Sequence, residues 1–301
     1  MRKECLAEVV GTFILVFFGC GVVAVDVISG AHLGLFQVAI VWGLAVNLAI
    51  YLVGAISGAH LNPAITVSMA VYRSHDFPAR KIAPFIAAQL GGAVLAATAL
   101  YALFSPTLRK FEAAHHLVRG GSGSELSAMM FGEYFPNPAI YGTTPEAFAQ
   151  VPLSIAFVAE LMGTAFLALG VFALTDRKKF DDPKTGFRMF PYCIGLVLAI
   201  CIIMFAPFSQ AGFNPARDFG PRLVSYLAGW GGVALPGPQG GFFLVYIVAP
   251  IVGALVGGSA YTVLARLSPA RKSGDAEAPE AAGAPAVGPS PLRLAGRAGG
   301  R

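Results

Sequence analysis

Six apolar segments, each long enough to cross a lipid bilayer, restrict this chain to a small set of folds. A helix that crosses the ~30 Å hydrocarbon core needs about 20 mostly apolar residues. Charged residues make up only 12% of the chain, against about 25% in soluble globular proteins. We therefore expect an all-α membrane protein with six transmembrane helices, at about 5–28, 36–56, 82–104, 152–175, 190–208 and 241–265.

Two further apolar segments are too short to span the membrane. They run from Asn62 to Tyr72 and from Asn214 to Leu227, and at 1.5 Å per residue they reach only about 16–20 Å. We interpret both as re-entrant half-helices.

The basic residues predict an orientation. If both termini are cytoplasmic, all but five of the 21 Lys and Arg residues fall on the cytoplasmic side, as the positive-inside rule requires; the five are Arg109, Lys110, Arg119, Arg217 and Arg222. The apolar segment after Met1-Arg2-Lys3 is too long for a signal peptide, so we expect a retained helix. The prediction is a multi-pass protein of the plasma (inner) membrane.

The chain repeats itself at one fixed spacing. Three matches are each offset by 152 residues: Ala7–Thr12 with Ala159–Thr164, Gly43-Leu44 with Gly195-Leu196, and Asn62-Pro63-Ala64 with Asn214-Pro215-Ala216. Each half holds three spans, an odd number, so the halves enter the membrane from opposite faces. This pattern predicts an inverted repeat, which commonly places a solute pathway near the midplane.

The repeat defines the expected organisation of the chain. The first repeat covers residues 1–104 and the second covers 151–267. Between them, residues 105–150 are expected to form a long extracellular loop. Residues 268–301 are rich in Ala, Pro and Gly, and we expect a disordered cytoplasmic tail.

The two Asn-Pro-Ala sequences are predicted to start the half-helices. Asparagine is a good N-cap and proline is favoured at the first helical position. Inversion brings the two helix N-termini together near the membrane centre, where each carries roughly +0.5 elementary charge and repels cations, including hydronium. The remaining amide N–H groups of Asn62 and Asn214 can face a passing oxygen.

The segments that approach the half-helices, 57–61 and 209–213, leave main-chain carbonyls without helical partners. Such a backbone is tolerated at membrane depth only where it lines a wet cavity or is buried in protein. Carbonyls on one wall and apolar side chains on the other suit a solute with hydroxyl groups on one side. A third copy, Asn137-Pro138-Ala139, has no partner at the repeat offset and is soon followed by Pro145, so we interpret it as a turn and not a helix.

One acid lies near the start of the first span in each half. Glu8 and Glu160 would cost a few kcal/mol in the membrane without partners. The topology lets each carboxylate accept hydrogen bonds from the loop of its own half. The alternative, a proton-relay pair in a coupled transporter, fits less well because a proton path would defeat a charge-excluding pore.

Arg217 follows the second motif directly. A cation beside a positive helix end is electrostatically unfavourable, which indicates a functional role, and an arginine at a constriction raises the barrier to cations. The neighbouring Asp218 has three interpretations: a pair with Arg222, a bond to the loop, or a first-turn acid that suits the helix dipole. His60 is either pore-facing or bonded within its loop.

Other classes of function have little support. The four cysteines lie within or beside apolar segments without the spacing of a metal site. No nucleophile–base pair or cofactor motif stands out, and no basic patch interleaves with aromatic residues. We therefore expect no metal, no cofactor, no nucleic-acid partner and no enzymatic activity.

Two segments carry a family resemblance. Ser57–Ala64 (SGAHLNPA) and Gly212–Pro221 (GFNPARDFGP) resemble the two signature loops of major intrinsic proteins, the aquaporin family. Within that family, Asp218 and the His115–Gly120 segment are similar to bacterial glycerol facilitators. The resemblance covers about residues 4–267. It implies the aquaporin fold, a homotetramer with one pore per protomer, and a narrow filter near the outer mouth.

By position, the resemblance places the filter at Trp42, Ile202, Ala211 and Arg217. Base rates alone would put Trp42 in the core or against lipid. Trp42 and Arg217 fit a glycerol facilitator. Such facilitators resemble one another in having a small residue where Ile202 stands and an aromatic residue where Ala211 stands. In this chain the large and the small side chain have exchanged positions, which resembles the filter of plant nodulin-26-type members. We expect an aquaglyceroporin that passes glycerol and related small uncharged solutes, with some water, and excludes ions and protons. Channels for water, urea, ammonia or neutral metalloids, and a proton-coupled secondary transporter, remain alternatives.

Overall fold

The structure is a computed structural model that describes residues 1–176 and 189–267. Residues 1–265 form one compact unit, and of the second unit, 266–301, only Arg266 and Leu267 are described. The expected disordered tail at 268–301 therefore lies outside the described residues. So do ten of the basic residues used to orient the chain: Arg177, Lys178, Lys179, Lys184, Arg188, Arg271, Lys272, Arg293, Arg297 and Arg301.

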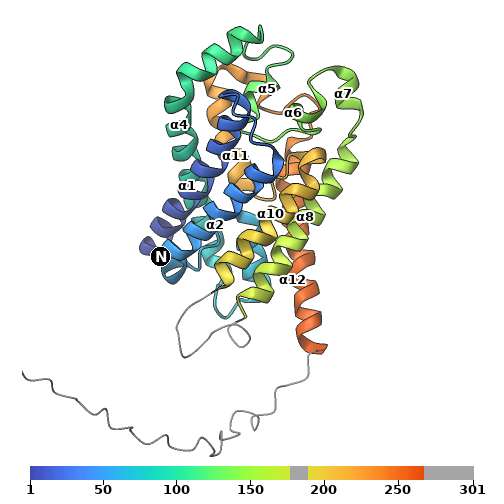
Figure 1. Cartoon of the computed structure of the whole chain (residues 1–301). Helices are drawn as coiled ribbons and strands as arrows, with labels where there is room; N and C mark the ends of the chain where they lie inside the picture. Colours follow the sequence, from blue (N-terminus) through green and yellow to red (C-terminus); the bar gives the residue numbers. More distant parts are fainter. Residues whose placement is uncertain (177–188, 268–301) are drawn as a thin grey trace, which may run out of the picture. The chain divides into compact units, whose positions relative to one another are not determined.

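Six helices of the described part are long and apolar enough to cross a membrane, and this part contains no strand. They pack as a bundle in which α5, α6 and α7 lie at the end opposite the N-terminus (Figure 1). The α-helical portions are α1 (Arg2–Val23), α2 (Leu35–Ser57), α4 (Ile82–Ala114), α8 (Leu153–Leu174), α10 (Phe190–Ser209) and α12 (Ala249–Leu267). A π-helix, η1 (Ala24–Ile28), extends α1, and another, η5 (Phe243–Val248), precedes α12.

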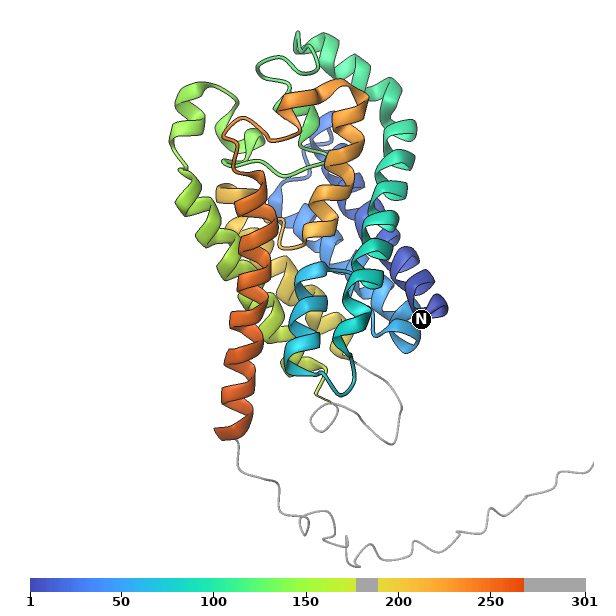
Figure 2. The ribbon, with the colours of Figure 1, turned by 180° about the vertical axis from the view of Figure 1, so that it is seen from behind.

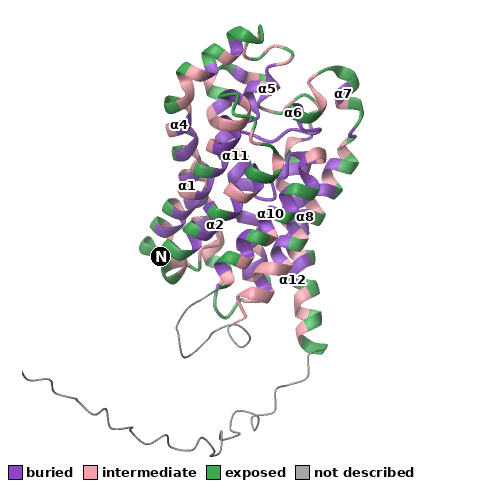
Figure 3. Cartoon of the chain, in the orientation of Figure 1, coloured by how far each residue is buried: buried purple, intermediate pink, exposed green. Residues whose placement is uncertain are grey.

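Buried and exposed residues alternate along the helices of the bundle (Figure 3), and many of the exposed residues are large and apolar. Leu6, Phe36, Ile200 and Met204 are each more than 60% exposed. An apolar outer surface of this extent is expected of a protein whose surroundings are lipid. The bundle is therefore that of an integral, multi-pass membrane protein.

The third long helix differs from its sequence-based prediction. Hydropathy ends the span at 104, whereas α4 continues to Ala114. Residues 105–114 include Arg109, Lys110 and Glu112, so their hydropathy is too low to indicate a membrane span, although their backbone is helical. The segment expected to be a long loop therefore begins as helix.

The rest of that segment holds three short helices, α5 (Glu125–Ala128), α6 (Pro138–Tyr141) and α7 (Pro145–Ala149). The prediction that the third Asn-Pro-Ala forms a turn and no helix was wrong, because the short helix α6 begins at Pro138. The Asn137 side chain caps α6 by accepting from the Ala139 N–H at 3.0 Å. The helix then ends at Gly142, which has a φ of 85°.

The half-helices are α3 (Pro63–Tyr72) and α11 (Pro215–Ser225). In Figure 2, α3 lies towards the end of the bundle that carries the N-terminus, and α11 lies towards the end that carries the short helices. A π-helix, η3 (Tyr226–Trp230), follows α11. The two half-helices thus approach the centre from opposite ends.

Two repeat-related glycines set the distance between the halves. A Cβ added at Gly43 of α2 would lie 2.6 Å from the Gly195 carbonyl oxygen, and one added at Gly195 of α10 would lie 2.4 Å from the Gly43 oxygen. Small residues at such crossings let membrane helices approach closely. Because these glycines are partners in the repeat and also touch, the crossing of α2 and α10 lies where the two halves meet.

Candidate functional site

The loops that lead into the half-helices share an unusual backbone. Gly58, Ala59 and Leu61 have φ values of 87°, 50° and 55°, and their repeat counterparts Gln210, Ala211 and Phe213 have values of 61°, 64° and 54°. A left-handed conformation costs a non-glycine residue about 1–2 kcal/mol. In the described part of the chain, nothing donates to the carbonyls of residues 58–60 or 210–212. The strain thus leaves two rows of free acceptors.

The carboxylate of Glu8 holds the first loop. Glu8 is fully buried and accepts hydrogen bonds from Ser57 Oγ (2.7 Å), His60 N (2.9 Å), Leu61 N (2.7 Å) and Gln89 Nε2 (2.8 Å). These bonds satisfy two main-chain donors that the loop cannot pair within itself.

The carboxylate of Glu160 holds the second loop in the same way. It is also fully buried and accepts from Ser209 Oγ (2.7 Å), Gly212 N (2.8 Å) and Phe213 N (2.6 Å). In both halves these contacts span 49, 52 and 53 residues. The repeat is therefore conserved between the halves down to individual hydrogen bonds.

The two asparagines link the halves at the centre. Asn62 Oδ1 caps α3 by accepting from Ala64 N, and Asn214 Oδ1 caps α11 by accepting from Ala216 N. Asn62 Nδ2 donates to the Phe213 carbonyl at 2.9 Å, and Asn214 Nδ2 donates to the Leu61 carbonyl at 2.7 Å. An amide carries two N–H groups, so one remains on each asparagine.

One cavity includes both loops and both asparagines. One part of its lining is main chain and amide, at residues 58–62 and 211–214. The other part is largely apolar and comes from α2, α3, α8 and α10: Val46, Ile50, Ile65, Met69, Leu167, Val171, Ile194 and Leu198. The cavity therefore combines hydrogen-bonding groups from the two loops with an apolar surface formed by the helices.

The four residues that the sequence places at the filter all line this cavity. Trp42 comes from α2, Ile202 from α10, Ala211 from the second loop and Arg217 from α11, and none is more than 5% exposed. The Trp42 ring occupies the space at Gly19 of α1, where an added Cβ would lie 2.2 Å from the ring. The four residues thus reach one cavity from four segments.

The Arg217 guanidinium is held from several sides. Its Cζ lies 4.3 Å from the centroid of the Trp42 ring. Nη1 donates to the Phe131 carbonyl at 3.4 Å and lies 3.7 Å from Cys20 Sγ. Nη2 forms an ion pair with Glu133. The sequence did not point to Phe131 or Glu133, because neither belongs to a repeated segment.

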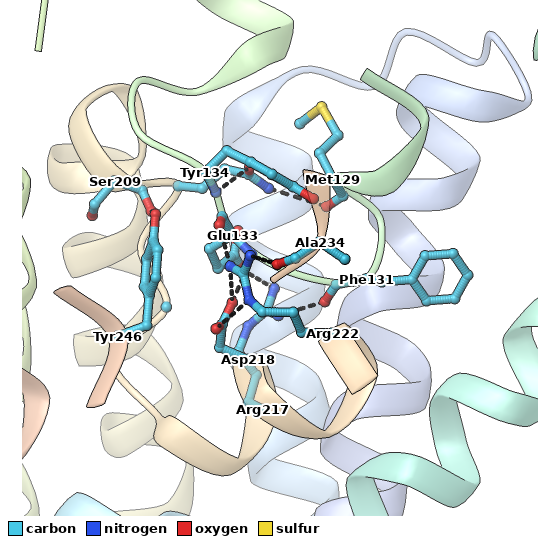
Figure 4. A network of polar contacts seen from close by, with 12 residues as sticks. Met129, Phe131, Glu133, Tyr134, Ser209, Arg217, Asp218, Arg222, Ala234 and Tyr246 are labelled. Carbon is cyan, nitrogen blue, oxygen red and sulfur yellow. Dashed lines mark hydrogen bonds and ion pairs between the residues drawn. The ribbon is translucent and has the colours of Figure 1, made fainter. Parts of the chain in front are cut away.

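Figure 4 shows the polar network behind Arg217. Arg222 Nε and Nη2 each lie 2.9 Å from an oxygen of Asp218, and Arg222 Nη1 donates to the Ala234 carbonyl at 2.7 Å. Asp218 Oδ1 also accepts from the Glu133 N–H at 2.6 Å. Of the interpretations left open for Asp218, the pair with Arg222 and the bond to the loop both occur.

The His60 side chain lies among aromatic rings. Its centroid is 4.4 Å from that of Phe77 and 5.2 Å from that of Phe85, while its main-chain N–H is the group that bonds to Glu8. His60 also contributes to the cavity lining. Among the described residues, no group of three or more His, Cys, Asp or Glu side chains is placed to hold a metal.

Six membrane-crossing helices, with two half-helices that meet around a lined cavity, define an integral membrane channel built as an inverted repeat. The family model of the major intrinsic proteins matches residues 1–261, and the chain belongs to this family. It is a channel and not an enzyme.

Known proteins agree with this assignment. The chain is 41% identical over 265 residues to a glycerol uptake facilitator protein of Escherichia coli, covering 88% of each chain. It is 40% identical over 262 residues to one from Pseudomonas aeruginosa, covering 87% of this chain and 88% of the relative. A propanediol uptake facilitator of Citrobacter freundii is 38% identical, over 88% of this chain and 92% of the relative. The X-ray structure of the aquaglyceroporin from Plasmodium falciparum matches with a TM-score of 0.72 and 26% identity, covering 88% of this chain and 98% of that one.

Proposed function

We propose that this chain is a passive channel for glycerol and related small uncharged solutes, with some water, and that it excludes ions and protons. Relatives named for glycerol and propanediol uptake support this proposal. The observation that carries it is the cavity between the two Asn-Pro-Ala helix starts, with free carbonyls on one side and apolar side chains on the other.

A polyol fits such a cavity because its two faces differ. Its hydroxyl groups donate to the free carbonyls of residues 58–60 and 211–212 and accept from the spare N–H groups of Asn62 and Asn214. Its carbon backbone lies against Ile50, Leu198 and their neighbours. Hydrogen bonds to the wall replace those lost to water, so the solute enters without a large desolvation cost.

Charged solutes meet a different barrier. An ion loses far more hydration free energy on entering a narrow, partly apolar cavity than a neutral solute does. The N-termini of α3 and α11 each add roughly +0.5 elementary charge at the centre, and Arg217 adds a cation at the filter. In this proposal Glu8 and Glu160 hold the two loops, and His60 shapes the cavity wall beside the first loop.

Trp42, Ile202, Ala211 and Arg217 are the proposed filter. Ala211 is small and Ile202 is branched, the reverse of the sizes expected in a typical glycerol facilitator, so we expect an opening of a different shape. Water, urea, ammonia and neutral metalloids therefore stay as alternative solutes. A proton-coupled transporter is disfavoured, because each buried carboxylate is fixed by at least three hydrogen bonds.

Assembly and topology belong to the same proposal. We infer a homotetramer in the plasma (inner) membrane, with both termini cytoplasmic and α5–α7 outside. The repeats would cover 1–104 and 151–267, with an extracellular connection at 105–150 that includes the end of α4, and a cytoplasmic tail at 268–301. The excess of basic residues near the assigned cytoplasmic ends supports this orientation.

Stopped-flow light scattering of proteoliposomes tests the proposal. After an osmotic step in glycerol we expect rapid re-swelling, lost or strongly slowed in Arg217→Leu and Trp42→Ala. The control, Arg109→Leu, removes an exposed arginine that, among the described residues, bonds to Ser105 one helical turn away, and it should re-swell like the parent. Shrinkage in an impermeant sugar without glycerol entry would leave a water pore. The absence of both responses would favour urea, ammonia, metalloids or a coupled transporter.

A further inference from the structure

Glu133 is a buried acid that the conduction pathway does not contact directly. It lies in the connection between α5 and α6, is 1% exposed, and is absent from the residues that line the cavity. Its carboxylate faces the guanidinium of Arg217 and forms an ion pair with it. The link between Glu133 and the cavity is therefore Arg217, which contacts both.

The main chain of Glu133 is anchored independently of its side chain. Its N–H donates to Asp218 Oδ1 at 2.6 Å, and its carbonyl accepts from Arg222 Nη2. At the preceding residue, Gly132, an added Cβ would lie 2.9 Å from Arg222 Cζ. The backbone thus stays against α11 even if the carboxylate is neutralised, so the acid is not required to hold the loop.

The other charges at this end of the cavity already have partners. Arg222 is matched by Asp218 through two contacts of 2.9 Å. The Glu160 carboxylate is occupied by one hydroxyl and two main-chain N–H groups. Arg217 and Glu133 remain as counter-ions of each other. The positive charge that Arg217 presents to the cavity therefore depends on Glu133.

Glu133 also limits the freedom of the guanidinium. Arginine has five N–H donors, and the contacts of Arg217 with Phe131, Cys20 and Glu133 use three of them. The Trp42 ring covers one face of the group. Two donors are left for a solute, in one fixed orientation.

We infer that Glu133 is a positioning residue of the filter, which fixes the Arg217 guanidinium and offsets the positive charge that a passing solute meets. The inference rests on the proposed function in that it treats Trp42 and Arg217 as the filter. It predicts that loss of the Glu133 charge makes the constriction net positive and opens it to small anions.

Protonation of Glu133 should have the same effect as its replacement by glutamine. Burial raises the pKa of the Glu133 carboxyl above its usual range, and the Arg217 guanidinium opposes part of that rise. A raised pKa means that the carboxyl is charged in alkali and becomes neutral as the pH falls. The charged and titratable groups around it are Arg217, Asp218 and Arg222 of α11, Glu160 of α8, Tyr246 of η5, Cys20 of α1 and the adjacent Tyr134.

Nitrate influx into proteoliposomes, followed with an entrapped anion-sensitive dye, tests the inference. Nitrate is a small planar anion whose own charge does not change over the pH range used. At about pH 9 we expect Glu133→Gln to admit nitrate at least about ten-fold faster than the parent, because one nearby negative charge has gone. On acidification to about pH 5.5 the parent should rise towards the variant, which should stay flat.

Two further variants separate a charge effect from a structural one. Glu125→Gln neutralises another buried acid, the first residue of α5. It is not among the described partners of the Arg217 side chain, and its nitrate influx should follow that of the parent. In an Arg217→Met background the Glu133→Gln change should lose its effect, because effects carried through a shared partner are not additive. Equal nitrate influx in the parent and Glu133→Gln at about pH 9, or an undiminished effect without Arg217, would overturn the inference.

The pH profile of the parent stands as an independent test if Glu133→Gln does not insert, since a flat parent profile would also overturn the inference. Failure of the proposed function would look different. It would appear as absent glycerol re-swelling of the parent, whereas nitrate reports the charge at Arg217 whichever neutral solute the channel carries.

Discussion

The two halves of the molecule hold their loops identically but differ in charge. Glu8 and Glu160 bind the loops over the same sequence separations, and the two asparagines exchange hydrogen bonds across the centre. After the motif, however, the first half continues with Ile65 and Thr66, where the second has Arg217 and Asp218. The loop backbone is thus built twice, and the charged pair that follows the motif occurs only once.

The difference extends to what supports each loop. In the first half the extra partner of Glu8 is Gln89, a neutral amide from α4 that also donates to Thr66. In the second half the support comes from the long connection, through Glu133, and carries charge. Symmetry is kept where the chain must solve a main-chain problem and is broken where one end of the pathway must discriminate between solutes.

The largest expected effect concerns what the halves share. Glu8→Gln and Glu160→Gln should each prevent recovery of a monodisperse protein in detergent. Glutamine turns an N–H group towards main-chain donors, and each unsatisfied buried donor costs about 1–3 kcal/mol. Size-exclusion chromatography and thermal unfolding measure this. Glu4→Gln serves as control, since Glu4 is partly exposed and pairs with Lys81. A half that tolerates the change would show that the two loops are not equivalent.

A smaller effect on stability is expected when the repeat-related glycines of the two halves are replaced by alanine. An added Cβ at Gly163 would lie 2.0 Å from the Phe213 ring, and one at Gly11 would lie 2.5 Å from Leu61 Cδ2. Overpacking costs about 1–3 kcal/mol, and a leucine can rotate away more easily than a ring. We expect Gly163→Ala to lower the Tm more than Gly11→Ala. Gly91→Ala, with nothing within 4 Å of its added Cβ, should leave the Tm almost unchanged. The reverse order for the two repeat glycines would contradict this account.

The smallest effect should be confined to the first half. Gln89→Leu removes the donor shared by Glu8 and Thr66, at a cost of about 1–3 kcal/mol for the acceptors left unpaired. Glu8 would keep three donors, the number that Glu160 has, so the loop should hold and the solute preference should not change. Thermal unfolding and glycerol re-swelling check both statements. The exposed Thr98, altered to Val, is the matched control on α4. A change in solute preference would mean that selectivity is not confined to the second half.

Much of the fold follows from the sequence, because membrane spans and the repeated motif are local signals. The half-helices at Pro63 and Pro215 begin where the asparagine caps predict. The end of α4 at Ala114 was missed because polar residues conceal a helix from hydropathy, and the helical turn at Pro138 was missed because Asn137 was given no capping role. These errors concern parts of the chain that lack a repeat counterpart.

The candidate site shows a similar division. Trp42, Ile202, Ala211 and Arg217 could be assigned by position, and the structure brings them to one cavity. Glu133 could not, because its importance arises from a loop that folds back onto α11. The only signal in the sequence is that Glu133 is the one charged residue between Glu125 and Glu146.

The reciprocal bonds at the centre also bear on the order of events during synthesis. Asn62 donates to a carbonyl 151 residues further along the chain, and Asn214 donates to one 153 residues back. A ribosome delivers the first half to the membrane long before residue 213 exists. Until then the Asn62 amide and the Leu61 carbonyl lack the partners that they have in the complete chain. The centre of the pathway can therefore be completed only after the second loop has been made.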